Sequence, residues 1–452
     1  MSKIKDLIAR VKQSTFFVSV FKVGSGQLIA QLMALASVPI LSRIYTDFDY
    51  GDLAMITSTA AIILNIATMG LNSAIMKPEK DEESQTVFTV AFLTNFFISI
   101  AITVFCAIFS GWFKLMEIPG DYLCGLILMW IYIFVYSTSS LLTVYVNRKK
   151  EYNKLFFNPI IGAVANFVIA IPLGLLGLGY VGLMVTYIIQ YLIIDVHMMW
   201  RDLPFASNFK MKDFKRVFVE YKEYVLFQYP SNFVGNFALE YPNQYLGRNF
   251  TNDALGDYSM CDRLLKYPIR LIAAPISTVY FKTATEYHQK GENLAAFTYK
   301  MISKVLLISV LPVAAFILIS EPLVAFVLGE EWRSAGTLSG FLIIQYVLLF
   351  CSQITSYCRV SIGQQKMNLV VTVVRLLVAM ASLFIGYYFW GTVVATVFAY
   401  SVGEAVYNIF DLGVNFFCMD KKYMWKFLAI SIAYTIIMFG FMGIRTLMFG
   451  FD

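Results

Sequence analysis

Long runs of apolar residues, separated by short polar segments, make up most of the chain. A helix needs roughly twenty apolar residues to cross the hydrocarbon core of a bilayer, and most of these runs reach that length. The runs are continuous rather than alternating, which argues against a transmembrane β-barrel. We predict two groups of six membrane-spanning helices and a thirteenth, at about residues 16–41, 50–76, 87–110, 120–146, 157–177 and 178–200, then 223–247, 254–283, 298–320, 336–358, 368–390 and 391–416, and finally 424–449.

The composition changes this picture little. Of the 452 residues, 59% are hydrophobic and only 14% are charged, and the mean hydropathy is +0.68. Soluble domains carry about 25% charged residues, so this chain lacks the polar surface that a water-facing globule needs. We therefore predict an all-α polytopic membrane protein. The same figures exclude a disordered chain and a disulfide-rich secreted module.

The positive charges give an independent test of the topology. With the N-terminus in the cytoplasm, roughly five times as many of the 35 lysines and arginines fall in predicted inner segments as in outer ones, as the positive-inside rule requires. The largest inner segment, 201–222, is basic, and we expect it to be an amphipathic linker on the membrane surface. The predicted outer cations are Arg43, Lys114, Arg248, Arg333 and Arg445. Arg43 and Arg248 end their spans and are interpreted as anchors at the membrane interface.

A shift of 205 residues aligns part of the chain with itself. Leu41, Arg43, Thr46, Gly51, Asp52 and Met55 then coincide with Leu246, Arg248, Thr251, Gly256, Asp257 and Met260. Both copies connect the first and second spans of their group of six, so both groups enter the membrane in the same direction. We predict two lobes related by a pseudo-two-fold axis along the membrane normal, the N-lobe at 1–212 and the C-lobe at 213–420, with an extra hydrophobic span at 421–452.

Five cationic residues lie inside predicted spans, namely Lys22, Arg263, Lys266, Arg270 and Arg375. Each costs roughly 2.5–3.5 kcal/mol near the centre of a spanning helix, so each must face a cavity or a partner. Asp262, Lys266 and Arg270 are spaced four residues apart and share one helix face. Two interpretations stay open: Asp262 neutralises Lys266 by pairing one turn away, or the cations recognise an anionic substrate such as a phosphate.

The seventh span carries a stripe of polar side chains four residues apart, Gln228, Asn232, Asn236 and Glu240. Gln27 and Gln31 in the first span occupy the repeat positions of Asn232 and Asn236. These amides either join helices by hydrogen bonds or offer donors and acceptors to sugar hydroxyls. Candidate carboxylates for a coupling ion are those of Glu240, Asp262, Glu404 and Asp411.

Other chemistry finds little support in the sequence. The six cysteines form no CxxC pair and His197 and His288 are the only histidines, so we expect neither a metal site nor a cofactor. A P-loop, a nucleophile elbow and a paired-carboxylate motif are all missing, so nothing indicates an enzyme. No basic face sits on a soluble domain, which argues against nucleic acid as a partner.

Several short motifs resemble those of the Wzx-type polysaccharide flippases. They are Gly24-Ser25-Gly26-Gln27, Pro39-Ile40-Leu41-Ser42-Arg43-Ile44-Tyr45 followed by Tyr50-Gly51, Leu255-Gly256-Asp257-Tyr258-Ser259 with Arg263 and Pro268, and Leu328-Gly329-Glu330-Glu331-Trp332-Arg333-Ser334-Ala335-Gly336. Their order extends over most of residues 15–415. The resemblance implies a MATE-like fold of the multidrug/oligosaccharidyl-lipid/polysaccharide (MOP) exporter superfamily, from which the extra segment at 424–449 departs.

The resemblance also implies a function. Such proteins move undecaprenyl-diphosphate-linked oligosaccharide from the cytoplasmic to the outer leaflet of the bacterial inner membrane, for assembly of O-antigen, capsule or exopolysaccharide. Lys22, Arg263, Lys266 and Arg270 match the cationic cavity that the family is thought to use for the diphosphate–sugar headgroup. The partners it implies are this lipid-linked oligosaccharide, membrane lipids, a coupling proton or sodium ion, and the polymerase and chain-length proteins of the same pathway.

Two alternatives remain. A multidrug cation exporter on the same fold usually has a carboxylate in its first span, yet no acidic residue lies between Asp6 and Asp47. A membrane polysaccharide polymerase would carry a sizeable outer loop with catalytic residues, and the sequence predicts none.

Overall fold

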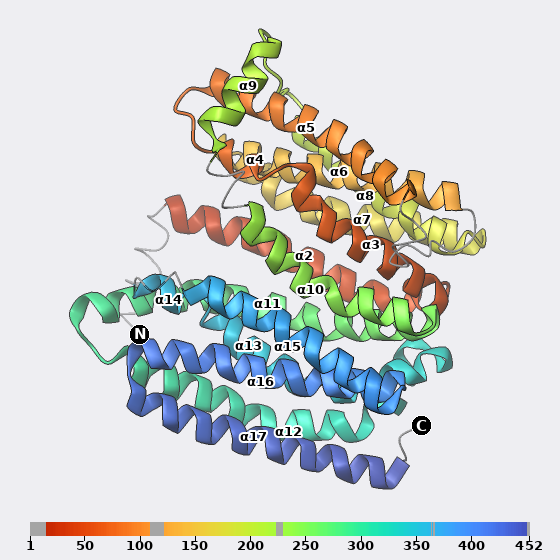
Figure 1. Cartoon of the computed structure of the whole chain (residues 1–452), viewed down its shortest axis with the longest axis vertical. Coiled ribbons are helices and arrows are strands. Elements are labelled where there is room, and N and C mark those ends of the chain that lie inside the picture. The colour runs from red at the N-terminus through yellow and green to blue at the C-terminus, as the bar shows by residue number, and fades with distance from the viewer. Residues whose placement is uncertain (1–14, 109–121, 223–228, 363, 365–366, 450–452) are drawn as a thin grey trace. The chain divides into compact units, whose positions relative to one another are not determined.

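The computed structural model describes residues 15–108, 122–222, 229–362, 364 and 367–449, and most of these are helical, with no strand among them (Figure 1). Four helices in this part are short: α4 (Leu71–Ala74), α9 (Met211–Glu220), η3 (Glu330–Trp332) and α14 (Cys358–Ser361). The long helices are α2 (Thr15–Leu41), α3 (Asp47–Ala67), α5 (Asp81–Ile108), α6 (Tyr122–Arg148), α7 (Tyr152–Leu175), α8 (Gly179–Met199), α10 (Tyr229–Asn249), α11 (Asn252–Lys290), α12 (Leu294–Leu328), α13 (Arg333–Ile354), α15 (Met367–Trp390), α16 (Val393–Met419) and α17 (Lys421–Phe449).

The predicted all-α membrane fold is confirmed, and every predicted span overlaps one long helix. Ten of the described helices are long and apolar enough to cross a membrane. Of the other three long helices, α10 and α11 are more polar. The third, α3, begins with Asp47, Asp49 and Asp52 and is apolar farther along. The count of twelve spans plus one therefore stays a prediction.

The chain divides into two compact units. Unit 1 comprises Met1–Tyr45 and Met55–Phe233, and unit 2 comprises Thr46–Ala54 and Val234–Asp452. The first two turns of α3 therefore belong to unit 2, whereas the remainder of that helix belongs to unit 1. The lobe boundaries drawn from the repeat stay a prediction.

In unit 1, α2 packs along α7, and α6 and α8 continue the bundle toward α5. Gly26 explains the close approach of α2 to α7, because a Cβ atom there would lie 2.2 Å from the carbonyl oxygen of Phe156. The expected amphipathic linker contains α9, which packs on α5. Its buried Val217 and the partly buried Phe214 and Phe218 belong to a core cluster of this unit.

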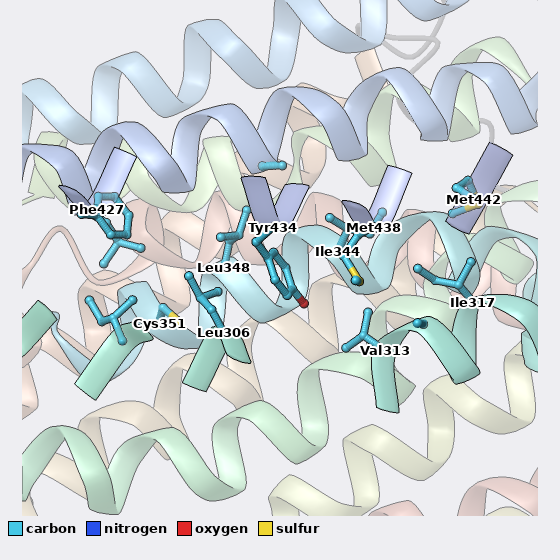
Figure 2. Packing of buried hydrophobic residues seen from close by; sticks show 14 of the residues in the cluster. Leu306, Val313, Ile317, Ile344, Leu348, Cys351, Phe427, Tyr434, Met438 and Met442 are labelled. Atoms are coloured by element: carbon cyan, nitrogen blue, oxygen red, sulfur yellow. The ribbon is translucent and has the colours of Figure 1, made fainter. Parts of the chain in front are cut away.

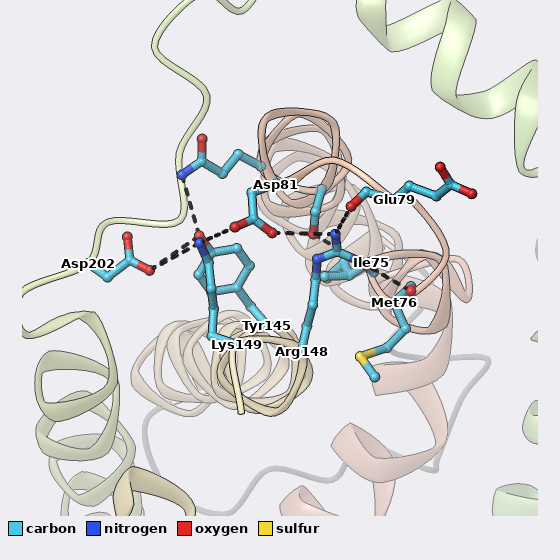
Figure 3. A network of polar contacts seen from close by, with 10 residues as sticks. Ile75, Met76, Glu79, Asp81, Tyr145, Arg148, Lys149 and Asp202 are labelled. Carbon is cyan, nitrogen blue, oxygen red and sulfur yellow. Dashed lines mark hydrogen bonds and ion pairs between the residues drawn. The ribbon is translucent and has the colours of Figure 1, made fainter. Parts of the chain in front are cut away.

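Two basic residues at the C-terminal end of α6, Arg148 and Lys149, contact the turn before α5 (Figure 3). Arg148 donates to the backbone carbonyls of Met76 and Glu79 at 3.3 and 3.2 Å and also reaches Asp81. The Lys149 ammonium lies 2.8 Å from the Asp81 carboxylate, and this hydrogen bond raises the pKa of Lys149. These contacts hold the turn before α5 against the end of α6.

The core of unit 2 lies where α12, α13 and α17 meet (Figure 2). The buried side chains come from all three helices, among them Leu306, Ile317, Ile344, Leu348, Phe427 and Met438. The extra helix α17 is therefore an integral layer of this unit. It runs beside both α12 and α16 (Figure 1).

The sequence repeat coincides with a crossing of two helix N-termini inside unit 2. A Cβ atom on Gly51 would lie 1.8 Å from the carbonyl oxygen of Asn252, and one on Gly256 would lie 1.8 Å from that of Asp47. These two contacts are equivalent under the shift of 205 residues. Asn252 also donates a hydrogen bond to the carboxylate of Asp52. Only glycine allows the start of α3 and the start of α11 to approach this closely.

Candidate functional site

Helix α11 carries the densest group of charged side chains within the apolar part of unit 2. The Lys266 ammonium lies 2.5 Å from the Asp262 carboxylate, with 27% and 16% of the two side chains exposed. Tyr346 of α13 donates its hydroxyl proton to the other oxygen of Asp262. The pairing of Asp262 with Lys266, one of the two interpretations of their spacing, is therefore present. Pro268 and Pro275 leave α11 continuous from Asn252 to Lys290.

Arg263 is half-buried on the same helix. Its guanidinium lies over the ring of Tyr50, 5.3 Å from the ring centroid. Tyr50 in turn packs edge-on against the buried Trp332, with ring centroids 5.5 Å apart. Two positions before Arg263, Cys261 approaches the carbonyl oxygen of Ala335 and is fully buried. Aromatic contact and packing therefore fix the orientation of this part of α11.

Arg375 of α15 has a carboxylate partner on the next helix. Its guanidinium contacts both carboxylate oxygens of Glu404 in α16, at 3.0 and 3.4 Å. Only 2% of the Glu404 side chain and 19% of the Arg375 side chain are exposed. The guanidinium also lies 5.5 Å from the ring centroid of Tyr407. A forked contact of this kind satisfies both charges within the helix bundle.

The fourth candidate carboxylate, Asp411, has a partner that the sequence analysis missed. Arg359 of α14 lies 2.7 Å from it, with 8% and 6% of the two side chains exposed. Ser352 of α13 donates a hydrogen bond to the other Asp411 oxygen. Arg359 directly follows the span predicted to end at residue 358, where an exposed cation beside the membrane is the ordinary expectation. Its burial could be foreseen only from the partner 52 positions away.

Arg445 is a second buried arginine whose partners the sequence did not predict. It lies within α17, is 4% exposed, and its predicted position on the outer side stays a prediction. It contacts Thr337 of α13 and Glu321 of α12, the latter at 3.5 Å. Arg333 binds the same carboxylate at 3.0 Å. The ends of α12 and α17 and the start of α13 therefore meet at the same end of unit 2.

Lys22 in unit 1 is also held by a partner. Its ammonium donates to the amide oxygen of Asn153 on α7. Farther along α2, Gln27 is exposed, whereas the amide oxygen of Gln31 is buried without a hydrogen-bond partner in the described part of the chain. Gln31 is thus a polar group in unit 1 that is able to accept a hydrogen bond.

On α10, Asn236 is half-buried, and Glu240 accepts a hydrogen bond of 3.1 Å from Asn243. Arg43 and Arg248 are exposed, in agreement with an interfacial position. Gln228 and the side chains of Asn232 and Arg270 lie outside what the structure describes. In the structure, several of the predicted residues thus have ion-pair or hydrogen-bond partners within the chain. The role of each as a substrate or ion contact stays a prediction. Among the described residues, no group of three or more His, Cys, Asp or Glu side chains is arranged to hold a metal ion.

Known structures of two kinds share this fold. An inward-facing multidrug resistance MATE family transporter of the MOP superfamily superimposes with a TM-score of 0.66 at 16% identity, over 90% of this chain and 95% of that one. The lipid II flippase MurJ in an inward closed conformation gives a TM-score of 0.67 at 11% identity, over 96% of this chain and all of that one. A MATE protein in complex with MaL6 gives 0.54 at 14% identity, over 93% and 96% of the two chains. No protein of curated function matches the sequence.

A family match completes the comparison. Residues 40–336 match the family described as polysaccharide biosynthesis protein. The matched region includes the crossing of α3 with α11 and the charged part of α11. It ends at the start of α13, before the helices that carry Arg375 and Asp411. The chain therefore belongs to the polysaccharide biosynthesis protein family and has a MATE-like fold.

Proposed function

We propose that this protein is a flippase that moves undecaprenyl-diphosphate-linked oligosaccharide across the bacterial inner membrane, from the cytoplasmic to the outer leaflet. Its N-terminus lies in the cytoplasm. The observation that carries the proposal is membership of a polysaccharide biosynthesis family combined with a transporter fold. A fold of this kind moves a substrate by alternating access, so the oligosaccharide headgroup crosses while its lipid tail stays in the bilayer.

The charged part of α11 supports an anionic headgroup as substrate. Lys266 and Arg263 are partly exposed, unlike the deeply buried Arg359. Lys266 pairs with a carboxylate one turn away, and Arg263 lies over an aromatic ring. A diphosphate offers both cations oxygen acceptors and a stronger charge than one carboxylate. In the proposal, Lys266 exchanges Asp262 for the diphosphate, and Arg270 adds a third cation. The amides of Gln27, Gln31, Asn232 and Asn236 serve the sugar hydroxyls.

The experiment uses proteoliposomes with a fluorescent undecaprenyl-diphosphate oligosaccharide. Wild-type protein should make the sugar accessible to a membrane-impermeant reagent. Arg263→Gln and Lys266→Gln should each lower the rate at which the sugar becomes accessible by at least tenfold. Lys282→Gln is the matched control because it removes a cation from the same helix, at a side chain that is 56% exposed and 3.9 Å from Glu286. Equal rates for all four proteins would contradict the assignment of α11 to the substrate.

The same vesicles test the multidrug alternative. An exporter of organic cations would transport ethidium against a proton or sodium gradient and would leave the lipid-linked sugar in place. A flippase gives the opposite pair of results. The two activities therefore separate in one preparation.

Ion coupling follows from the exchange at Lys266. When the diphosphate takes Lys266, Asp262 loses its cation and becomes able to take up a proton or a sodium ion. Asp262→Asn keeps an oxygen that accepts from Tyr346 but carries no charge to couple. It should bind the lipid-linked sugar while its transport rate no longer depends on either gradient. An unchanged gradient dependence would move the coupling to Glu240, Glu404 or Asp411.

A further inference from the structure

A basic hollow lies on the exposed surface of unit 2, between the N-terminal parts of α12 and α17. Its accessible volume is about 480 Å³. Three lysines line it, Lys300 and Lys304 from α12 and Lys426 from α17, together with Tyr299, Ser303 and Tyr423. All three lysines are exposed. None of them is within 4 Å of a carboxylate in the part of the chain that the structure describes.

The floor of the hollow is fixed by aromatic contacts. The rings of Tyr299 and Tyr423 lie 5.8 Å apart and join the two helices. The Lys426 ammonium lies 5.1 Å from the Tyr423 ring centroid, which holds it on the α17 side. The hydroxyl oxygen of Ser303 is buried without a hydrogen-bond partner in the described residues. The hollow thus offers three exposed cations above a fixed floor, a set that suits a phosphate group.

The hollow continues into an apolar surface along both helices. On α12, Lys300, Lys304, Leu307 and Leu311 follow one helix face, and Leu307 and Leu311 are 73% and 79% exposed. On α17, Ile430 lines the hollow and Ile437, two turns farther, is 48% exposed. Leu311 lies about 16 Å beyond Lys300 at 1.5 Å per residue. One face therefore changes from cationic to apolar over the length of a headgroup and the start of an acyl chain.

The length of α12 places this change at the membrane surface. Its 35 residues extend about 52 Å, whereas the hydrocarbon core is about 30 Å thick. Part of the helix must therefore project through the headgroup layer. Lys300 and Lys304 occupy the second and third turns, where long cationic side chains reach the phosphate level.

We propose that the hollow between α12 and α17 is a binding site for an anionic glycerophospholipid. Its phosphodiester contacts Lys300, Lys304 and Lys426, and its acyl chains lie along Leu307, Leu311 and Ile437. Charge complementarity selects the headgroup, and the apolar strip excludes a free phosphate as the natural occupant. The site does not depend on the proposed transport function, and α17 is needed to form it.

The test measures phosphatidylglycerol retained by the full-length purified protein, by native mass spectrometry and by the rise in melting temperature on adding the lipid. Each lysine near an anionic headgroup contributes roughly fivefold in affinity, so Lys300→Gln/Lys304→Gln/Lys426→Gln should bind about a hundredfold more weakly. Phosphatidylcholine should bind both proteins equally. The matched control, Lys210→Gln/Lys212→Gln/Lys215→Gln, removes three exposed lysines at α9 and should retain the lipid.

Several results would overturn the proposal. Equal retention of phosphatidylglycerol by wild type and the α12–α17 variant would exclude the site. An equal loss of the lipid from the α9 control would show that only the overall charge of the protein matters. Displacement of the lipid by millimolar inorganic phosphate or by glycerophosphoglycerol would show a small-anion site instead. If the triple variant does not fold, Lys426→Gln alone should weaken binding about fivefold, and no change there would count against the site.

Discussion

The pair formed by Arg375 and Glu404 tests whether a cation within the bundle supports the fold or contacts the substrate. Arg375→Met leaves the Glu404 carboxylate, 2% exposed, without its cation. Breaking a buried ion pair from one side costs about 3–5 kcal/mol of unfolding free energy. Glu404→Met should cost less, about 1–3 kcal/mol, because the Arg375 side chain is 19% exposed and still lies over Tyr407.

The double variant Arg375→Met/Glu404→Met removes both charges and fills the space with apolar side chains. Such replacements of a buried pair are often neutral, so its stability should return to within about 1 kcal/mol of wild type. The two single changes would then show a coupling energy of about 4–8 kcal/mol, the sum of the two single losses. Heat or denaturant unfolding in a fixed lipid mixture, followed by tryptophan fluorescence and by size-exclusion chromatography, measures all four proteins.

Transport by the same four proteins separates the two roles. If Arg375 acts through Glu404, the double variant should regain transport of the lipid-linked sugar along with its stability. A double variant that is as stable as wild type but does not transport would refute this reasoning and place Arg375 at the substrate. A stable Arg375→Met single variant would show instead that the pair contributes nothing to the fold.

Three further predictions concern other contacts. Gly51→Ala and Gly256→Ala should each lower the free energy of unfolding by about 1–3 kcal/mol, because their Cβ atoms would overlap backbone oxygens. Gly443→Ala in α17, with open space around it, should be neutral or stabilising by up to about 1 kcal/mol. Thermal unfolding ranks the three variants, and equal effects would argue against the close crossing. Arg445→Met should cost about 3 kcal/mol and Arg333→Met far less, although both bind Glu321, because their side chains are 5% and 49% exposed. The same unfolding assay compares the two variants, and the reverse order would contradict the difference in burial. Asp81→Asn should lower the free energy of unfolding by less than about 1 kcal/mol, because the Asp81 side chain that pairs with Lys149 is 58% exposed. This loss should shrink in 1 M salt, which screens exposed charges. A loss that salt does not change would show that the Asp81–Lys149 pair is not a surface ion pair.

The helices could be predicted from the sequence because their signal is local. Twenty or more apolar residues in succession have one stable arrangement in a bilayer, so the spans predicted at 157–177 and 391–416 differ from α7 and α16 by only a few residues at most ends. The pairing of Asp262 with Lys266 was one of the two interpretations of their spacing for the same reason, since residues four apart lie on one face of a helix. The repeat coincides with the glycine crossing, because both copies retain the glycine that the contact needs, but the sequence alone did not predict a contact between the copies.

The remaining pairs could not be predicted because their partners are distant in the sequence. Arg359 and Asp411 are 52 positions apart, and Arg445 and Glu321 are 124 apart. Nothing in the local pattern distinguishes Arg359, beside an apolar run, from an ordinary cation at a membrane surface. Only the packing of α14 against α16 removes it from water and supplies its carboxylate. A local signal did exist for Arg445, which interrupts the apolar run of α17.

The charges of unit 2 differ in how readily they can change partners, and this decides where substrate chemistry is possible. Arg359 and Arg445 are almost fully buried on their carboxylates, so giving up a partner would cost several kcal/mol. Lys300, Lys304 and Lys426 are exposed, and any contact there is exchanged with water or lipid at little cost. Lys266 lies between these limits, since it is partly exposed and its partner is a single carboxylate that a diphosphate exceeds in charge. A transporter must bind its substrate and release it again, and the proposed contact of Lys266 with a diphosphate meets both requirements.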